Sequence, residues 1–138
     1  MSGIITSDDQ VKQQAIRTYE SINVDHWLGL FQNYFTPRAD TLLADFIPCT
    51  FAGYSPISLN NQFVPPTKQR DAEWISRMIR QTFAATADNA QQIVGFYIFG
   101  AGSWQYAQTL DEPLNVIAGT LYPIDFALQT IGLQLAYA

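Results

Sequence analysis

A glycine-rich connection between two β-forming runs is the feature that most constrains how this chain can fold. Residues 92–99, QIVGFYIF, are dominated by branched and aromatic side chains, which favour an extended backbone. Residues 100–103, GAGS, follow at once, and their glycines permit the backbone angles of a tight hairpin turn. Residues 104–110, WQYAQTL, then alternate along two faces of a strand. The pattern predicts an antiparallel hairpin and hence a β-sheet protein.

Other runs with strand character lie between proline, glycine and asparagine signals. Residues 26–35, HWLGLFQNYF, are apolar on both faces and predict a central strand. Residues 74–85 fit either a helical face or a twisted strand, and the β-like sequence after them favours the strand. Asp111-Glu112-Pro113 is expected to end the second strand of the hairpin. Short strands are also expected over residues 54–59 and 114–117, and a closing strand over 121–134.

One helix is predicted near the start of the chain, over residues 8–22. Ser7 and Gln10 match a capping box at its beginning. An apolar stripe then recurs at helical spacing, made of Val11, Ala15, Tyr19 and Ile22. This stripe either packs on the rest of the domain or contacts a neighbouring subunit. We expect residues 1–25 to form an arm whose stripe reaches a neighbour, and residues 26–138 to form a β-sandwich domain.

Residues 35–59 are predicted to be a structured crossover loop between two strands. Five residues are expected to shape this loop, namely Pro37, Asp45, Gly53, Tyr54 and Pro56. Prolines end extended runs, a glycine can adopt a positive φ, and an aspartate favours turns and caps. Together with the strands and the helix, the loop predicts a mainly β fold, an antiparallel β-sandwich or jelly-roll-like barrel with one short N-terminal helix.

Composition restricts the partners of such a domain. The 138 residues suffice for one domain with its own core, and only 14% of them are charged. The net charge is −5 with no cluster of basic residues, so nucleic-acid binding is not expected. Neither a signal peptide nor an apolar run of membrane-spanning length is recognisable. So few charges suggest that a partner covers part of the surface, and the alternative is a monomer with a neutral polar surface.

The sequence offers little that points to catalysis, and no enzyme activity, cofactor or metal site is predicted. The chain has one cysteine and one histidine, Cys49 and His26, and no motif links them. Cys49 is expected to be a small buried residue. Asp40 and Asp45 are expected to serve turns and caps rather than to form a catalytic carboxylate pair. Trp104 and Tyr106 could form a sugar-stacking platform, although a place in the core of the hairpin is the simpler interpretation.

The order of these segments resembles a family of small tailed-bacteriophage structural proteins. In that family an LFxNxFTP strand leads into TLADFxxATFxGY, and YGYFxxD, xxAERF and GDTLxVxPxFxL strands follow. Here residues 30–37, LFQNYFTP, match the first block, and residues 41–46 and 50–54, TLLADF and TFAGY, match the second. Residues 94–97, VGFY, stand for the third block, and Gly119-Thr120-Leu121 with Pro123 and Phe126 stand for the last. The similarity covers residues 28–129, and it departs from the pattern at Cys49 and at Thr109-Leu110.

The resemblance implies a virion protein rather than an enzyme. It implies a capsid decoration or cement protein that stabilises the head shell, forms a trimer and contacts the major capsid protein. The alternative that it leaves open is a tail, neck or baseplate adaptor or a fibre-attachment protein, and a carbohydrate-binding module is a third possibility. The expected location is the outer surface of the virion capsid, after synthesis in the host cytoplasm.

Overall fold

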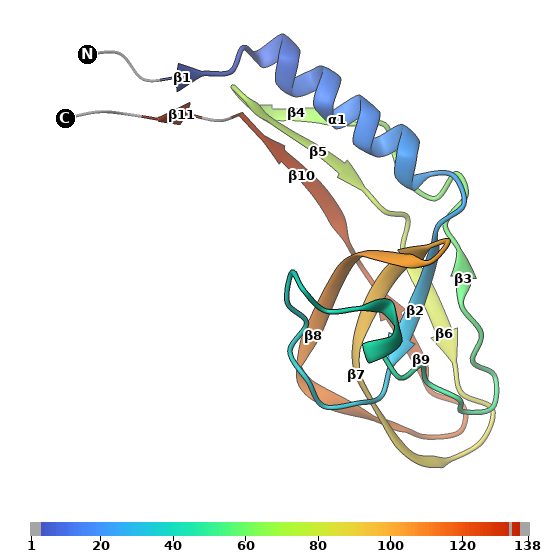
Figure 1. Cartoon of the computed structure of the whole chain (residues 1–138). Coiled ribbons are helices and arrows are strands. Elements are labelled where there is room, and N and C mark those ends of the chain that lie inside the picture. Colours follow the sequence, from blue (N-terminus) through green and yellow to red (C-terminus); the bar gives the residue numbers. More distant parts are fainter. Residues whose placement is uncertain (1–3, 133, 136–138) are drawn as a thin grey trace. The chain divides into compact units, whose positions relative to one another are not determined.

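The fold is mainly β, as predicted, with 46% of the residues in strands, 14% in helices and several antiparallel sheets. The structure is a computed structural model, and it describes residues 4–132, 134 and 135. Figure 1 shows the elements in chain order: β1 (Ile4–Ile5), α1 (Asp8–Ile22), β2 (Trp27–Phe31), η1 (Leu43–Asp45), β3 (Ile57–Ser58), β4 (Thr67–Arg70), β5 (Glu73–Arg77), β6 (Gln81–Ala84), β7 (Asn89–Gly100), β8 (Ser103–Val116), β9 (Leu121–Ile124), β10 (Ala127–Ile131) and β11 (Gln134–Leu135).

The chain divides into two compact units. Unit 1 comprises residues 1–24, 60–80 and 125–138, and unit 2 comprises residues 25–59 and 81–124. The division differs from the predicted one, in which the first 25 residues were an arm separate from a single β domain. The helix is instead part of unit 1 together with β4, β5 and β10.

Unit 1 is a three-stranded antiparallel sheet, in the order β10-β5-β4, with α1 packed against β5 and β10. The helix spans the predicted residues, and the Ser7 hydroxyl accepts a hydrogen bond from the Gln10 amide at its start. Val11, Ala15 and Ile22 are buried, while Tyr19 is half-buried. The stripe therefore packs on its own unit, and the prediction that these residues reach a neighbouring subunit is wrong for the three buried ones. An apolar stripe shows that a helix face is covered but not by which chain.

Asp8 connects the start of the helix to the turn between β4 and β5. Its Oδ1 atom accepts hydrogen bonds from the Ala72 amide, at 3.0 Å, and from the Trp74 indole N–H, at 3.2 Å. Its Oδ2 atom lies 3.2 Å from Nζ of Lys68. The Ala72 bond, more than the other contacts, lowers the pKa of Asp8 from its ordinary value of 3.8. The charged carboxylate is thus the form that holds the helix to this turn.

We expect Asp8→Asn to destabilise the protein near neutral pH and to matter progressively less in acid. Because the pKa of Asp8 is lower in the folded state, its contribution is present above 3.8 and is lost as pH falls through the folded-state pKa. Urea unfolding at pH 6 and pH 3 would measure the gap between wild type and variant. Asp9→Asn is the matched control, since it removes a carboxylate from the same helical turn. A gap that stays constant with pH, or that Asp9→Asn reproduces, would contradict this role.

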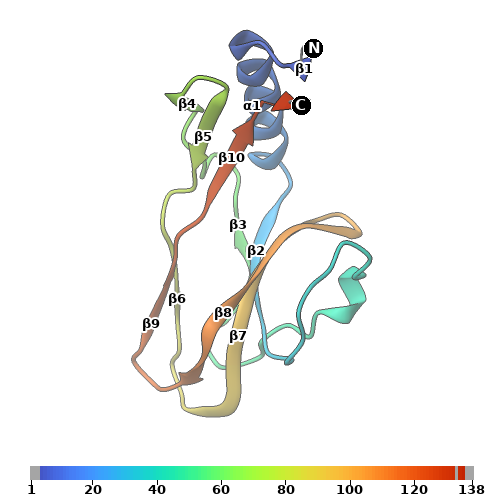
Figure 2. The same cartoon turned by 90° about the vertical axis from the view of Figure 1, so that its left-hand side faces the viewer.

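Unit 2 is built on a four-stranded antiparallel sheet in the order β3-β2-β7-β8. Strand β2 lies between β3 and β7, as its two apolar faces predict, and β7 and β8 form the predicted hairpin. The β6–β9 pair lies on one side of this sheet and the crossover loop on the other (Figure 2). Ring contacts of Tyr54 with Phe83 and of Phe51 with Tyr122 connect residues of the loop's far end to β6 and β9.

The hairpin is longer than predicted, because Asp111-Glu112-Pro113 does not end β8. Ile93 pairs with Leu114 and Gly95 pairs with Thr109, so one residue of β7 lies opposite four residues of β8, Leu110 to Pro113. The extra residues form an irregularity in the ladder. A proline has no backbone N–H to donate, but in this irregular part no ladder hydrogen bond requires one. Asp111-Glu112-Pro113 therefore interrupts the pairing and not the strand.

Two runs that were each expected to be one strand are divided between the units. Residues 74–85 are extended, as predicted, but form β5 in unit 1 and β6 in unit 2. Residues 121–134 likewise contain β9 in unit 2 and β10 in unit 1, and of this run Leu133 lies outside the described residues. Beside both breaks, Arg80 and Asp125 form a two-bond ion pair, with N–O distances of 3.0 and 2.7 Å.

Candidate interaction surface

The first half of the crossover loop is held in place by one asparagine side chain. Asn33 follows β2, and its Nδ2 group donates to the Asp45 carbonyl at 2.8 Å. The Asn33 Oδ1 atom accepts from the Ile47 amide at 2.9 Å. The two bonds connect Asn33 at the beginning of the loop to Asp45 and Ile47, so the ends of the segment 34–46 are held close together. The sequence prediction placed Asn33 on a strand face and missed this role, although a single asparagine after an apolar strand suits loop hydrogen bonds.

Asp45 has the capping role that was predicted for it. Its Oδ2 atom accepts a hydrogen bond from the Leu42 amide at 2.8 Å, which satisfies an amide at the start of η1. Pro37 precedes a turn in which the Thr41 hydroxyl accepts from the Arg38 amide at 2.8 Å. η1 is a single turn of 3-10 helix. Asp40 is exposed in the turn that precedes it.

Aromatic rings anchor the underside of the loop to the sheet. Phe46 is buried and stacks on Tyr97 of β7, with ring centroids 4.5 Å apart and an interplanar angle of 6°. Edge contacts join Phe46 to Phe31, Phe35 and Trp104 at centroid distances of 5.1 to 5.5 Å. Phe46 is thus the centre of the cluster that fixes the loop, since every other ring of the set touches it.

A groove of about 440 Å³ lies between the crossover loop and the β7–β8 turn. Its lining includes Leu42, Leu43 and Trp104. The Trp104 indole N–H donates to the Thr41 carbonyl at 2.7 Å, and its ring contacts Phe46. Leu42 is 67% exposed at the rim. Because Trp104 is held by the loop and the cluster, it fits the core-of-hairpin interpretation better than that of an open stacking platform.

The far half of the loop depends on Gly53 and Tyr54. Gly53 has a φ of 94°, as its predicted role requires, and a Cβ atom there would lie less than 3.0 Å from the Ala84 carbonyl oxygen. The Leu30 amide donates to the Tyr54 hydroxyl at 3.1 Å. Burial raises the pKa of Tyr54 to about 12. Pro56 is exposed just before β3. These residues position the loop and offer no reactive group near neutral pH.

The two residues with the most reactive side chains are not assembled into a site. Cys49 is 2% exposed, as expected of a small buried residue, and its amide donates to the Leu30 carbonyl. Burial raises the pKa of its thiol to about 12, so the nucleophilic thiolate is scarce at neutral pH. His26 is half-buried at the start of β2. Within the described part of the chain, no three His, Cys, Asp or Glu side chains are grouped as metal ligands would be.

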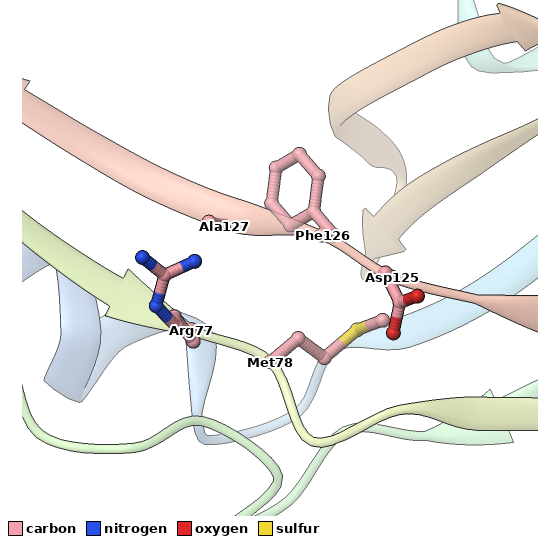
Figure 3. A pocket seen from close by; sticks show the side chains of 5 residues that line it. All are labelled: Arg77, Met78, Asp125, Phe126 and Ala127. Atoms are coloured by element: carbon pink, nitrogen blue, oxygen red, sulfur yellow. The ribbon is translucent and has the colours of Figure 1, made fainter.

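A second cleft lies in unit 1, where the ladder between β5 and β10 ends at the Arg77–Ala127 pair (Figure 3). It measures about 320 Å³ and is lined by Arg77, Met78, Asp125, Phe126 and Ala127. Its carboxylate, on Asp125, is already paired with Arg80, which lowers the pKa of Asp125. The cleft therefore presents one guanidinium and apolar side chains rather than a converging set of catalytic groups.

Charge is distributed unequally between the two units. Unit 1 contains six acidic and six basic residues, whereas unit 2 contains six acidic residues and one basic residue, Arg38. The whole net charge of −5 therefore belongs to unit 2. Unit 2 also exposes seven large apolar side chains, namely Trp27, Tyr34, Leu42, Ile47, Leu114, Ile117 and Leu121. Three of these, Leu42 and Ile47 on the crossover loop and Tyr34 directly before it, are called the crossover surface below.

Comparisons with known proteins add no family or relative to this description. No protein-family model matches the chain, and neither a curated protein nor a solved structure is significantly similar to it. Among the described residues, the single long helix falls short of the length and apolar character needed to cross a membrane.

Proposed function

We propose that this chain is a non-enzymatic structural protein of a tailed-phage virion that decorates the head shell and stabilises it. Two observations support the proposal. The first is the resemblance of residues 28–129 to small phage structural proteins. The second, which carries the choice of surface, is the crossover surface, whose apolar side chains project from a loop fixed by hydrogen bonds and aromatic packing.

A fixed apolar loop suits the docking of a preformed protein surface. Leu42 and Ile47 are 67% and 51% exposed, so burying them against a shell removes apolar area from water. The loop needs little ordering on binding, because Asn33 and Phe46 already hold it, and a smaller entropic cost favours affinity. The acidic character of unit 2 disfavours contact with packaged DNA and suits the outer face of a shell.

Binding to shells that lack the protein tests the proposal. Purified protein is mixed with preformed empty shells of the phage that encodes it, and the bound fraction is measured by co-sedimentation. We expect saturable binding, which Leu42→Gln with Ile47→Gln weakens about tenfold or more. The matched control is Val64→Gln with Ile79→Gln, which replaces two similarly exposed apolar residues of unit 1 and should leave binding unchanged.

Three results would contradict the proposal in different ways. Wild-type protein that does not bind shells would exclude decoration. Equal weakening by both pairs of substitutions would show that the crossover surface is not the contact. Virions in which the protein is found at the tail or neck by electron microscopy would favour the adaptor alternative instead.

A further inference from the structure

We propose that β8 of one copy pairs antiparallel with β8 of a second copy, which joins their four-stranded sheets across a two-fold axis. The surface involved is the edge of the sheet and not the crossover surface. The inference does not rest on the virion role, so either proposal can fail without the other.

Strand β8 is a long strand with a strand partner on one side only. It spans 14 residues, Ser103–Val116, and is the outermost strand of its sheet (Figure 1). Among the described strands it pairs only with β7. Along such an edge, every second residue directs its N–H and C=O groups away from the sheet, and these groups can pair with another strand.

The other sheet edges are short or charged. Strand β4 has four residues, and both Lys68 and Arg70 within it form ion pairs. Strand β3 has two residues, and β6 and β9 have four each. Strand β10 has five residues and is contacted by α1. Lysine, arginine and short length are the features by which proteins protect edges against pairing.

Residues 103–110 of β8 contain no lysine or arginine and belong to a much longer strand. Their sequence, SWQYAQTL, contains no charge, no proline and no glycine. The charged residues of the strand, Asp111 and Glu112, lie beyond this segment beside Pro113, in the part where the ladder with β7 is irregular. The neutral segment is thus an uncharged edge of eight residues that ends at two acids and a proline. Its ladder with β7 has one irregularity, at Gln105, which lies between the Ile98–Tyr106 and Phe99–Trp104 pairs.

The positions of these acids favour a second copy in antiparallel orientation. If the two-fold axis passes between residues 107 and 109, Asp111 of one copy faces residues 103–107 of the other and Glu112 faces residues 102–106, all of which are uncharged. A parallel, in-register pair would place each acid next to the same acid of the other copy, and like charges on neighbouring strands repel. The antiparallel orientation is therefore the one in which two copies of β8 can pair without placing like charges together. It is also the orientation that gives a closed dimer, in which both copies use the same surface.

The long-range charges of the two copies oppose this association. Unit 2 has a net charge of −5, so two copies repel each other in dilute salt. At physiological ionic strength the Debye length is about 8 Å, which screens charges outside the contact. The dimer is consequently expected to be stronger at high salt, the opposite of an interface held by ion pairs.

Sedimentation velocity over a concentration series, at about 0.05 and 0.5 M NaCl, tests the pairing. We expect a monomer–dimer equilibrium that salt shifts towards the dimer. Gln105→Lys with Thr109→Lys should raise the dissociation constant about tenfold or more, because lysines protect an edge. Both residues are exposed, and the substitutions lower the net negative charge, so general repulsion cannot explain a loss of dimer.

Gln69→Lys on β4 is the matched control, since it adds the same side chain to an edge of the other sheet. It should leave the dimer unchanged, and thermal unfolding should show all variants folded. A monomer at every concentration, a trimer, or a dimer that the two β8 lysines do not weaken would each overturn the proposal. Slower amide exchange of residues 103–110 in concentrated protein would support it, and equal exchange at high and low concentration would contradict it.

Discussion

Gly95→Ala is expected to destabilise the protein by about 3 kcal/mol or more. Gly95 lies in β7 opposite Thr109, beside the irregular part of the ladder. A Cβ atom built on it would lie 2.5 Å from Cζ of Phe31 and closer still to the Gln108 carbonyl oxygen. Phe31 is fully buried and Gln108 contributes backbone, so neither atom can move without disturbing the sheet. Urea unfolding of the purified variant measures the cost.

Gly100→Ala is the matched control for this substitution. It places the same methyl group in the same strand, where the nearest atom would be Nε2 of His26 at 3.3 Å. We expect a change of no more than about 1 kcal/mol. The double variant Gly95→Ala with Phe31→Leu separates the two contacts, because it relieves the ring contact and leaves the carbonyl. If the two single variants were equally stable, the packing of Phe31 and the Gln108 carbonyl against Gly95 would not require a glycine there.

The sequence was sufficient to predict the elements that local rules control. Ser7 and the spacing of Val11 and Ala15 predicted both the start and the buried face of α1. The glycines at 100 and 102 predicted the hairpin turn, where Gly102 has a φ of 78°. The positive φ of Gly53 and the capping role of Asp45 follow from the same turn chemistry. The helix cap, the turn glycines and the capping aspartate follow from local backbone chemistry, and the helical spacing indicates that one face is buried without identifying what covers it.

The division into two units could not be predicted, because strand periodicity does not identify the sheet that a strand joins. Residues 74–85 and 121–134 alternate throughout, yet each run leaves one unit and enters the other. The need for glycine at position 95 was likewise not recognisable, because Gly95 lies within a run of residues typical of a β-strand. Its requirement comes from Phe31 and Gln108, which are 64 and 13 positions away in the sequence. Such long-range packing sets both the boundaries between the units and the requirement for glycine at position 95.

The crossover surface depends on the same kind of long-range packing. Neither its exposed apolar side chains nor the residues that hold the loop were identified from the sequence. Asn33 bonds both Asp45 and Ile47, and Phe46 reaches across to Tyr97 of β7. The sequence therefore predicted a structured loop at this place, but neither an interaction surface on it nor the contacts that make it rigid.

Phe46→Ala is expected to cost about 3–5 kcal/mol of folding free energy and to loosen the crossover loop. The substitution removes a buried ring that stacks on Tyr97 and contacts Phe31, Phe35 and Trp104, and the lining of the space left behind loses these contacts. Urea unfolding gives the free energy, and limited proteolysis of the folded protein reports the loop.

Ile47→Ala is the matched control, because it truncates the next residue of the same loop, which is 51% exposed. We expect it to change stability by less than about 1 kcal/mol while weakening shell binding, since its side chain belongs to the crossover surface. Phe46→Leu, which keeps much of the buried volume, should fall between the two in stability. If Phe46→Ala and Ile47→Ala cost the same free energy, the aromatic cluster is not the anchor of the loop. If Ile47→Ala instead leaves shell binding intact while Phe46→Ala abolishes it in a folded protein, the loop acts through its shape rather than through its exposed apolar side chains.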